Sequence, residues 1–422
     1  MKLIGRVRVA SDKSITHRAI IFAALSEGKT VIKYPLLGED CLSTLQIFES
    51  LGVKTTINEQ EIIIESQGKQ QFKQPSAILQ ANNSGTTARL LMGALCSLPF
   101  EWTLSGDASL NKRPMKRVSE PLSQMGACVT LTEGCLPATV KGASLHRMTY
   151  ELPVASAQVK SAIMLAALDA NGETIIHEPI KSRNHTEKMF EAFSLQYVEK
   201  NQRIYIKGPQ TPVTPGVVSV CADISSAAFL MVAATLLKGS EICLQDVGLN
   251  ETRSGILDVM REMNASVRIE NERLQGGELV GDIFVTSCED LKAVHIEGTL
   301  IPRLIDEIPI LALLAVFASG TTVIKDAQEL KVKETNRLDV TVSLLKALGA
   351  NIEATTDGML IHGNPMLSLN QVTVSSHGDH RLAMMLYVAR LVSAGRIEIE
   401  DLQALNVSYP QFIEDIQALE KE

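Results

Sequence analysis

Aromatic side chains are scarce in this chain. Phe, Trp and Tyr together make up 4% of its 422 residues, and only one of them is a Trp. Proteins that bind single-stranded nucleic acid stack the bases on aromatic side chains, so this class of protein is not expected. The formal net charge of −8 also argues against a nucleic-acid backbone as the main partner. Small anions are still suitable ligands, because a local basic cleft can override the net charge.

Paired cysteines and long apolar runs are lacking as well. The seven Cys are scattered, odd in number and form no CxxC motif, which is typical of reduced thiols in a cytoplasmic protein. The opening stretch MKLIGRVRVA is broken by cations and has no apolar signal core. The longest apolar runs, 227–237 and 308–318, are shorter than the ~20 residues that a bilayer needs. No membrane partner is expected, and both runs predict buried helices.

Motifs of several common sites are also missing. The chain has no GxxxxGK[ST] phosphate loop, no HExxH pair and no Cys cluster. The stretch His377-Gly378-Asp379-His380 offers metal-ligand types, but the next residue, Arg381, would repel a cation. An anion suits this place better than a metal, so no metal site is expected.

What the chain does contain is an internal repeat. A short β-rich run recurs six times, with neighbouring copies roughly 70 residues apart; the copies lie at 28–32, 98–104, 172–176, 239–243, 320–324 and 395–399. Four of the intervening helices end at a Gly or Asn that fits a left-handed C-cap, and an alternating hairpin follows each; these residues are Gly52, Gly126, Asn264 and Gly349. The third copy has Ser194 at this place, so a different cap is expected there.

The repeats predict the domain organisation. The sixth copy has a strand at 397–399 and a helix near 409–419 but no hairpin, and the opening strand at 3–9 can supply a missing piece. A chain of this length also favours two cores. We therefore expect an α/β protein in which 1–11 plus 225–422 form one domain and 12–224 form the other. Four helices are apolar nearly all round and are expected to be buried; they span 89–98, 161–168, 227–237 and 309–317.

Basic or hydroxyl residues open many of the helices, near positions 13, 86, 183, 253, 333 and 381. A helix N-terminus carries about half a positive charge, so a Lys or Arg there is unfavourable unless an anion binds. If the helices of each domain run parallel, two sets of positive ends can face one cleft. Such a cleft would attract polyanionic ligands.

Four motifs of this kind lie in the first half of the chain. In 11–18, Ser11 or Asp12 can cap a helix that runs to about Leu25 and has Lys13 in its first turn. In 82–89, a small polar turn presents backbone N–H groups to a phosphate or carboxylate. Pro114 predicts an extended Arg113 in the basic stretch 110–117. In 153–161, Ser156 and Gln158 offer neutral hydrogen bonds. Each motif alone is also explained by helix capping or by a solvated face.

The second half of the chain holds four more. Asn184 and Glu187 make a plausible capping box, which leaves Arg183 unexplained. Asp306 precedes a helix near Pro309 and lies in an apolar stretch, where burial raises the pKa of a carboxylate. Lys333 and Arg337 share a face, with Glu334 between them, if their segment is helical. Arg381 opens a further helix. A charged helix face is the alternative for the motif of Lys333 and Arg337.

Taken together, the motifs resemble those of the EPSP synthase family, the 3-phosphoshikimate 1-carboxyvinyltransferases. Their residues are similar to those of the branch of this family called class II. The matching stretches are SDKSITHRAI, NNSGTTARLL, GDASLNKRPM, LPVASAQVKSAIMLA, SRNHTEKM, NETRSGIL, LIDEIPILALLA, ELKVKETNRL and DHRLAM. The resemblance implies two domains of three βαβαββ units each, with buried parallel helices (an inside-out α/β barrel) and the active site in the interdomain cleft. It also implies that neither a metal nor an organic cofactor is needed. We expect a cytoplasmic monomer.

The implied reaction belongs to the shikimate pathway, which leads to chorismate and the aromatic amino acids. The enolpyruvyl group of phosphoenolpyruvate passes to the 5-hydroxyl of shikimate 3-phosphate through a tetrahedral intermediate, and phosphate is released. By motif match, shikimate 3-phosphate would be bound by Lys13, Ser14, Arg18, Ser156, Gln158, Arg183, Asp306 and Lys333. Phosphoenolpyruvate would be bound by Lys13, Asn83, Gly85, Arg113, Gln158, Arg337 and Arg381. Asp306 would be the base toward the hydroxyl, and Glu334 or Lys13 would deliver the proton to C3.

Some positions depart from the family pattern. Asn82 replaces the first Gly of the GNSGT turn, and Asn tolerates a positive φ best among other residues. Ser11 replaces a Gly, Asn336 replaces an Asp, and the stretch 405–410 offers no equivalent of a Lys common near the C-terminus.

Two alternatives stay open at this point. The related carboxyvinyltransferase of UDP-N-acetylglucosamine usually has Lys-Asn where Lys13-Ser14 stand, and a loop Cys that is missing between Cys96 and Cys128. A non-catalytic anion-binding repeat protein is the second alternative. Asp306 and Glu334 beside Lys333 argue against it, because a binder of anions gains nothing from neighbouring carboxylates.

Overall fold

The computed structural model describes residues 1–421. The chain divides into two compact units. The first, which we name the terminal unit, comprises 1–10, 221–274 and the chain from 278 onward; the central unit comprises 11–220 and 275–277. The boundaries at 10/11 and 220/221 compare with sequence-based expectations of 11/12 and 224/225.

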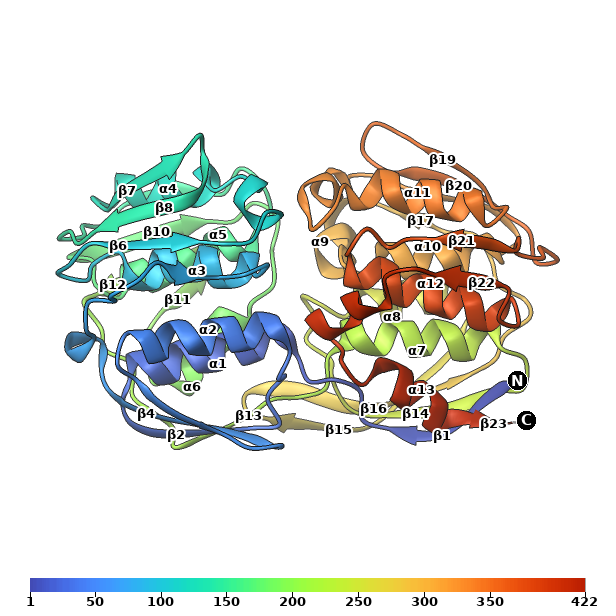
Figure 1. Cartoon of the computed structure of the whole chain (residues 1–422), viewed down its shortest axis with the longest axis horizontal. Coiled ribbons are helices and arrows are strands. Elements are labelled where there is room, and N and C mark those ends of the chain that lie inside the picture. Colours follow the sequence, from blue (N-terminus) through green and yellow to red (C-terminus); the bar gives the residue numbers. More distant parts are fainter. Residues whose placement is uncertain (422) are drawn as a thin grey trace. The chain divides into compact units, whose positions relative to one another are not determined.

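The central unit contains three four-stranded sheets with the same pattern of strand pairing (Figure 1). In each, two parallel strands lie beside an antiparallel hairpin. In spatial order the first sheet is β13 (Val217–Ser219), β2 (Glu27–Lys33), β4 (Glu61–Gln67) and β3 (Lys54–Ile57). The second is β5 (Leu79–Gln80), β6 (Trp102–Ser105), β8 (Cys135–Lys141) and β7 (Cys128–Thr132). The third is β9 (Thr149–Glu151), β10 (Gly172–His177), β12 (Arg203–Gly208) and β11 (Val198–Lys200).

The terminal unit has the same arrangement of strands, but among residues 1–421 its last sheet has two of the four strands. One sheet has the same four places and one added strand: β23 (Glu420–Lys421), β1 (Lys2–Val7), β14 (Glu241–Gly248), β16 (Glu278–Thr286) and β15 (Ser266–Gln275). The next is β17 (His295–Ile296), β18 (Gly320–Ile324), β20 (Met359–Gly363) and β19 (Asn351–Ala354). The last has only β21 (Val372–Val374) and β22 (Ile397–Ile399) within the described residues. The repeat of six is therefore confirmed, and the sixth copy ends where the sequence predicts.

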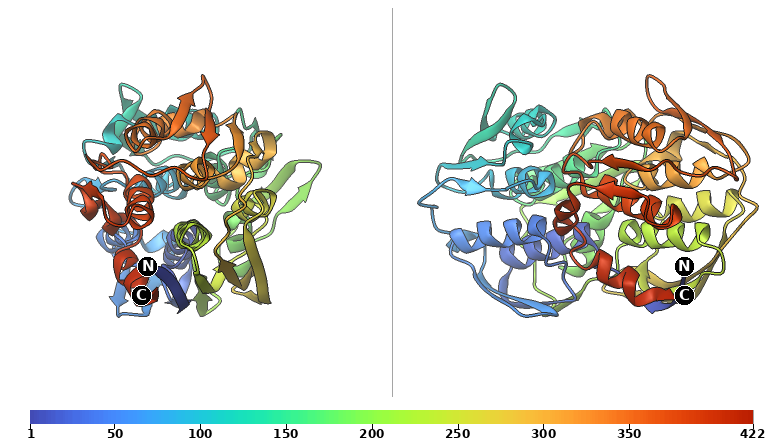
Figure 2. Two further views of the ribbon diagram at one scale, coloured as in Figure 1. Left: turned by 90° about the vertical axis from the view of Figure 1, so that its right-hand side faces the viewer. Right: turned by 45° about the vertical axis from the view of Figure 1, so that its right-hand side comes forward.

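The opening strand has the place that its sequence suggests. β1 pairs in parallel with β14, as β13 pairs with β2 in the central unit. It also pairs antiparallel with β23, so the first and last strands are neighbours (Figure 2).

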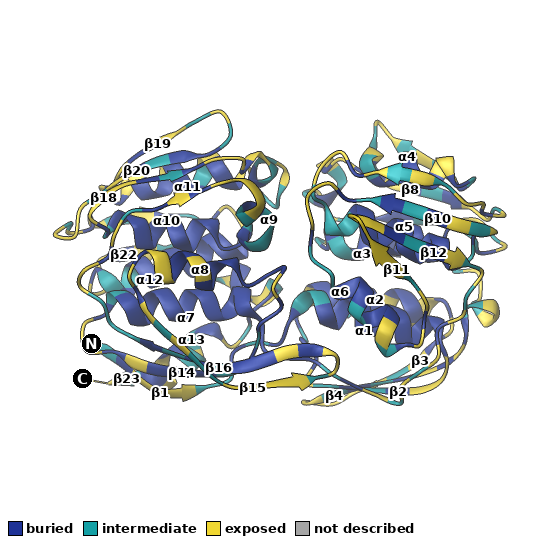
Figure 3. Cartoon of the chain, turned by 180° about the vertical axis from the view of Figure 1, so that it is seen from behind, coloured by how far each residue is buried: buried dark blue, intermediate teal, exposed yellow. Residues whose placement is uncertain are grey.

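In each unit buried helices form the interior, and the sheets and the partly exposed helices lie outside them (Figure 3). The helices of the central unit are α1 (Lys13–Leu25), α2 (Glu39–Ser50), α3 (Gly85–Leu95), α4 (Lys116–Gln124), α5 (Ala157–Ala167) and α6 (His185–Ala192). Those of the terminal unit are α7 (Ile224–Leu236), α8 (Gly255–Glu262), α9 (Ile301–Leu304), α10 (Ile308–Val316), α11 (Arg337–Ala347), α12 (His380–Val392) and α13 (Phe412–Leu419). Short 3-10 turns occur at Lys69–Gln71, Leu110–Lys112, Gly298–Leu300, Gln328–Val332 and Leu402–Val407.

The four helices expected to be buried are α3, α5, α7 and α10, and all are buried along nearly their whole length. α1 and α12 are equally buried although each carries several charged or polar residues. Across residues 1–421, no helix combines the length and the apolar character needed to cross a membrane.

The predicted left-handed C-caps are present. Gly52, Gly126, Asn264 and Gly349 have φ values of 93°, 96°, 67° and 95°. The expectation of a different cap in the third copy is wrong, because Ser194 adopts the same conformation with φ 58°. The N–H of Leu195 donates to the carbonyl of Phe190 at 2.8 Å, as the N–H of Val53 donates to Phe48 at 3.0 Å. The backbone therefore keeps one cap geometry even where the side chain disfavours it.

Candidate active site

Hydrogen bonds join the N-terminal turns of five helices in the central unit. His17 Nδ1 lies 2.8 Å from Thr44 Oγ1, and Thr44 Oγ1 lies 2.7 Å from Thr87 Oγ1, which links α1, α2 and α3. Arg18 donates to Ser161 Oγ at 2.8 Å and to Thr186 Oγ1 at 2.7 Å, which adds α5 and α6. The positive ends of these helices therefore meet at one place, as the parallel arrangement requires. We name this set of helix starts and their side chains the central cluster.

Lys13 is the first residue of α1, and the side chain of Asp12 caps the helix by accepting from the N–H of Ile15 at 2.8 Å. Both features agree with the sequence prediction. Lys13 Nζ also donates to Asp40 Oδ2 at 2.9 Å, from the first turn of α2. A carboxylate of the protein thus offsets the unfavourable cation at the helix start. Asp40 is a site residue that the sequence reasoning missed.

Neutral oxygen atoms orient the guanidinium of Arg18, which is almost completely buried. Besides the two hydroxyls above, it donates to the carbonyl oxygen of Ser14 at 3.0 Å. These three oxygen atoms fix the direction of the guanidinium. A buried cation held in this way is suited to bind an anion.

Gly85 opens α3 between two arginines. A Cβ atom at this position would lie 2.9 Å from Arg89 NH1 and 3.5 Å from Arg113 NH1. Only a glycine leaves both guanidinium groups undisturbed here. The preceding Asn82 has φ 49°, so the positive φ that the substitution for Gly suggested is present.

Amide side chains hold these two arginines. Arg113 has the predicted extended backbone and donates to Asn83 Oδ1 at 2.7 Å. Arg89 NH1 donates to Gln158 Oε1 at 2.7 Å, and Gln158 Nε2 donates to Thr86 Oγ1 at 3.1 Å. Arg89 was not singled out from the sequence, although it ends the NNSGTTAR stretch and shares its helix start.

The two remaining residues of the central cluster lie at the starts of α5 and α6. Ser156 is the N-cap of α5, and its hydroxyl accepts from the N–H of Val159 at 3.5 Å. Arg183 is half-buried in the segment before α6. Asn184 is the N-cap residue as expected, but Glu187 pairs with Lys160 at 2.7 Å, a partner outside the predicted capping box.

Asp306 lies among cations in the terminal unit. Its Oδ1 accepts from Lys333 Nζ at 3.2 Å and from Arg337 NH1 at 3.3 Å, and its Oδ2 lies 3.8 Å from Arg381 NH2. The expected apolar surroundings are therefore wrong, because ion pairs surround the carboxylate. We name these residues, with the neighbouring starts of α7, α8, α10, α11 and α12, the terminal cluster.

Arg337 is the centre of this cluster and is almost completely buried. It donates from Nε and NH2 to Asp379 at 2.9 and 3.1 Å and also to Glu334. Burial alone would lower the pKa of Arg337, but the carboxylates of Asp379, Glu334 and Asp306 outweigh it and raise that pKa. Lys333 and Arg337 do not share one helix, since α11 begins at Arg337, yet both reach Asp306.

A second buried group adjoins the first. Arg253 NH2 donates to Asp223 Oδ1 at 2.8 Å and to Ser225 Oγ at 3.0 Å, and Ser225 Oγ donates to Glu307. Glu307 Oε1 lies 3.8 Å from Arg381 NH1. Arg253 stands in the NETRSGIL stretch, which is the signal that identifies it. Glu307 is indistinguishable in the sequence from an ordinary acidic residue before a helix.

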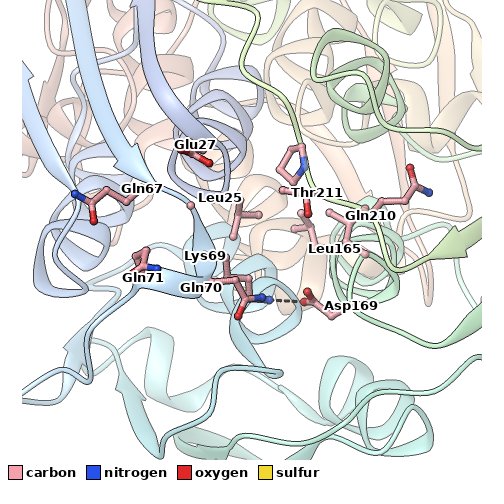
Figure 4. A pocket seen from close by; sticks show the side chains of 13 residues that line it. Leu25, Glu27, Gln67, Lys69, Gln70, Gln71, Leu165, Asp169, Gln210 and Thr211 are labelled. Carbon is pink, nitrogen blue, oxygen red and sulfur yellow. Dashed lines mark hydrogen bonds and ion pairs between the residues drawn. The ribbon is translucent and has the colours of Figure 1, made fainter.

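Among residues 1–421, no group of three or more His, Cys, Asp or Glu side chains is arranged to hold a metal ion. A pocket of about 250 Å³ lies elsewhere in the central unit, at the C-terminal ends of α1 and α5. Figure 4 shows Lys69 meeting Asp169 at its edge, with Leu25 and Leu165 also lining it. Its lining residues are distinct from those of the central cluster.

Comparison with known proteins identifies the family. A model of EPSP synthase (3-phosphoshikimate 1-carboxyvinyltransferase) matches residues 1–416. The 3-phosphoshikimate 1-carboxyvinyltransferase of Bacillus licheniformis is 49% identical over 419 residues, which cover 99% of this chain and 97% of that protein. The enzyme of the same name from Bacillus subtilis is 48% identical over 421 residues, 99% of this chain and 98% of that protein.

Solved structures agree with this. An EPSP synthase from Acinetobacter baumannii superposes with a TM-score of 0.86 at 38% identity, covering 99% of this chain and 96% of that one. The enolpyruvyl transferase NikO from Streptomyces tendae has a TM-score of 0.76 at 17% identity, covering 99% of this chain and 95% of that one, which shows the shared two-domain enolpyruvyl transferase fold. With its motifs, its fold and its relatives in agreement over almost the whole length, this chain belongs to the EPSP synthase family.

Proposed function

We propose that this chain transfers the enolpyruvyl group of phosphoenolpyruvate to the 5-hydroxyl of shikimate 3-phosphate, giving 5-enolpyruvylshikimate 3-phosphate and phosphate. The observation that carries the proposal is the gathering of helix N-termini, oriented cations and a carboxylate in the two clusters. Both substrates are polyanions, and helix starts with arginines are suited to phosphate and carboxylate groups. Family membership supports the same reaction.

We divide the residues between the substrates by motif match with the family. We assign shikimate 3-phosphate to Lys13, Ser14, Arg18, Ser156, Gln158, Arg183, Asp306 and Lys333. Phosphoenolpyruvate is assigned to Lys13, Asn83, Gly85, Arg113, Gln158, Arg337 and Arg381. Arg337 differs from the others because three carboxylates already occupy its donors. Its contribution to phosphoenolpyruvate binding therefore includes holding Asp306 and Glu334 in place.

The chemical steps need one base and one acid. The 5-hydroxyl oxygen forms a bond to C2 of phosphoenolpyruvate while its proton passes to Asp306, and C3 takes up a proton from Glu334 or Lys13. The C2–O bond to phosphate then breaks, C3 loses a proton, and the double bond forms again. Arginine and lysine side chains stabilise the charge that develops on the leaving phosphate.

One assay distinguishes the candidate functions. Phosphate release should require shikimate 3-phosphate and phosphoenolpyruvate together. Release that depends on UDP-N-acetylglucosamine in place of shikimate 3-phosphate would favour the related carboxyvinyltransferase. The absence of release with either acceptor, together with retained anion binding, would favour a non-catalytic binding protein.

The state of the protein in the cell is part of the same proposal. We expect a cytoplasmic monomer with no membrane or nucleic-acid partner. Light scattering during size-exclusion chromatography should give the chain mass of 45.9 kDa. A mass of twice this value would contradict the monomer.

A further inference from the structure

Lys160, in the first turns of α5, is completely buried and contacts three oxygen atoms. Its Nζ lies 3.1 Å from Glu178 Oε2, 2.7 Å from Glu187 Oε1 and 3.4 Å from the carbonyl oxygen of Ser182. The two glutamate side chains are only 5% and 2% exposed. The contacts with Glu178 and Ser182 are hydrogen bonds, and the contact with Glu187 is an ion pair without hydrogen-bond geometry.

All three partners of Lys160 belong to one short stretch of chain. This stretch, 178–187, runs from the end of β10 into the first turn of α6 and carries Arg183. Glu178 Oε1 also accepts from the backbone N–H of Ser182 at 2.8 Å and from its hydroxyl. Ser161, the neighbour of Lys160, holds the other end of the stretch, because its Oγ lies 2.6 Å from Thr186 Oγ1. Two adjacent residues of α5 thus fasten the chain on both sides of Arg183.

Stability alone is a weak explanation for this arrangement. Desolvation of buried charges cancels much of their attraction, so well-packed apolar residues often serve as well or better. Two carboxylates against one ammonium also leave a formal excess of negative charge in the buried network. What such a network does provide is a single defined geometry for the segment that it binds.

We propose that Lys160 is a positioning residue for shikimate 3-phosphate. It holds the stretch 178–187 and thereby sets Arg183, together with Thr186 beside Arg18, at the place where the substrate phosphate or ring hydroxyls are bound. This inference rests on the proposed function. It extends the site to a residue that does not touch the substrate.

The test is Lys160→Met, which keeps the length of the side chain and removes its charge. Without the ammonium group the two carboxylates repel each other, and the stretch moves. The KM for shikimate 3-phosphate should rise about tenfold to a hundredfold, since the loss of one hydrogen bond to a charged group has an effect of this size on binding. The KM for phosphoenolpyruvate and kcat should change by less than about threefold, because Lys160 contacts none of the residues assigned to the reacting centre.

Two variants serve as controls. Lys69→Met removes a partly buried cation from the ion pair with Asp169 in the same unit, at the opposite end of α5 (Figure 4). Lys181→Met removes a cation from the same stretch, where it pairs with Glu199 on the surface. Both should keep the wild-type KM for shikimate 3-phosphate. An equal rise in either control, or an unchanged KM in Lys160→Met, overturns the inference.

A milder variant covers the case in which Lys160→Met does not fold. Glu178→Gln keeps an oxygen for Ser182 but weakens the hold of Lys160, and a smaller rise confined to the same KM is expected. Equal rises for both substrates overturn the inference. Calorimetric titration with shikimate 3-phosphate separates this question from the proposed function. If the wild type binds it without releasing phosphate, the proposed reaction fails, and the affinities of the variants still decide the role of Lys160.

Discussion

Arginine side chains have different roles in the central cluster and in the terminal cluster. Arg18 donates to hydroxyl and carbonyl oxygens, which orient its guanidinium. Arg337 is bound by the carboxylates of Asp379, Glu334 and Asp306. The first arrangement favours the arrival of an anion, whereas the second fixes the direction of acidic groups. Both are buried, so neither loses much side-chain entropy when a ligand binds.

The carboxylate of Asp306 gives the sharpest prediction for a single residue. Asp306→Ala should lower kcat by about 10²- to 10⁴-fold, the range for loss of a general base. Binding of shikimate 3-phosphate should weaken far less, because several cations that hold it remain. Steady-state kinetics and calorimetric titration measure the two quantities. Asp290→Ala, which removes an exposed carboxylate of the same unit, is the control. Equal losses in binding and turnover would exclude Asp306 from the chemical step.

His17 leads to a prediction about pH. Burial, and then the charges of Lys13 and Arg18, hold the pKa of this imidazole well below its ordinary value. The unfolded chain therefore binds a proton at His17 near pH 6.5 and the folded chain does not. The free energy of unfolding should fall as the pH drops from 7 toward 5, by at most about 1.4 kcal/mol per unit.

Urea unfolding at several pH values measures this slope. The slope should be smaller in His17→Gln than in the wild type. His295→Gln, at an exposed position of β17, should keep the slope of the wild type. The same slope in both variants would contradict the assignment to His17.

The sequence identified the residues of the site better than it identified their partners. Three cations of the site stand in motifs with several cations or next to Gly or Pro, and such patterns can be recognised from the sequence alone. These residues are Lys13, Arg113 and Arg381. Asp40 and Glu307 look like ordinary acidic residues near helix starts, and only the packing of separate helices shows their contacts. The setting of Asp306 was misjudged for the same reason, since its cationic neighbours lie 27 or more positions away.

At the scale of secondary structure, the recurring helix end is the most regular element. Gly at the left-handed position has no Cβ to strain the backbone, which makes the cap readable from the sequence. The same geometry at Ser194 cannot be predicted from the sequence, because the residue type does not indicate it. The burial of α1 and α12 likewise cannot be predicted from their polar residues, because side chains of other elements pair with those residues.

Exchanging the two residue types tests this element. Ser194→Gly should raise the free energy of unfolding by about 1 kcal/mol, because a non-Gly residue pays that much for the left-handed conformation. Gly52→Ser, at the equivalent end of α2, should lower it by a similar amount. Urea denaturation measures both. Changes of the same sign in the two variants would show that local packing, rather than the backbone, decides the effect.

At the scale of the whole molecule, the repeat is what the sequence conveys best. Strands and caps are local signals; the strands recur in six copies and the caps in five of them. A strand or cap that is misassigned in one copy can therefore be recognised by comparison with the others. Where residues of different copies meet is set by packing, which no local pattern encodes. The expectation of one active site built from both domains stays a prediction.

A double variant tests that expectation. Lys13→Met changes the central cluster and Asp306→Asn the terminal cluster. If both act on one pair of substrates, the double variant should lose little more of kcat/KM than the worse single variant. Losses that multiply would show that the two residues act independently. Gel filtration and circular dichroism of each variant confirm that the fold is retained.

The pairing of β1 with β23 has a consequence for the order of the chain. Lys2 lies opposite Lys421 in adjacent antiparallel strands, so a short linker could join them and close the polypeptide into a ring. New ends could then be cut at an exposed hairpin tip such as Glu133, between β7 and β8. A circular permutant of this kind should fold and turn over like its parent, which would mean that the six copies need no fixed starting point.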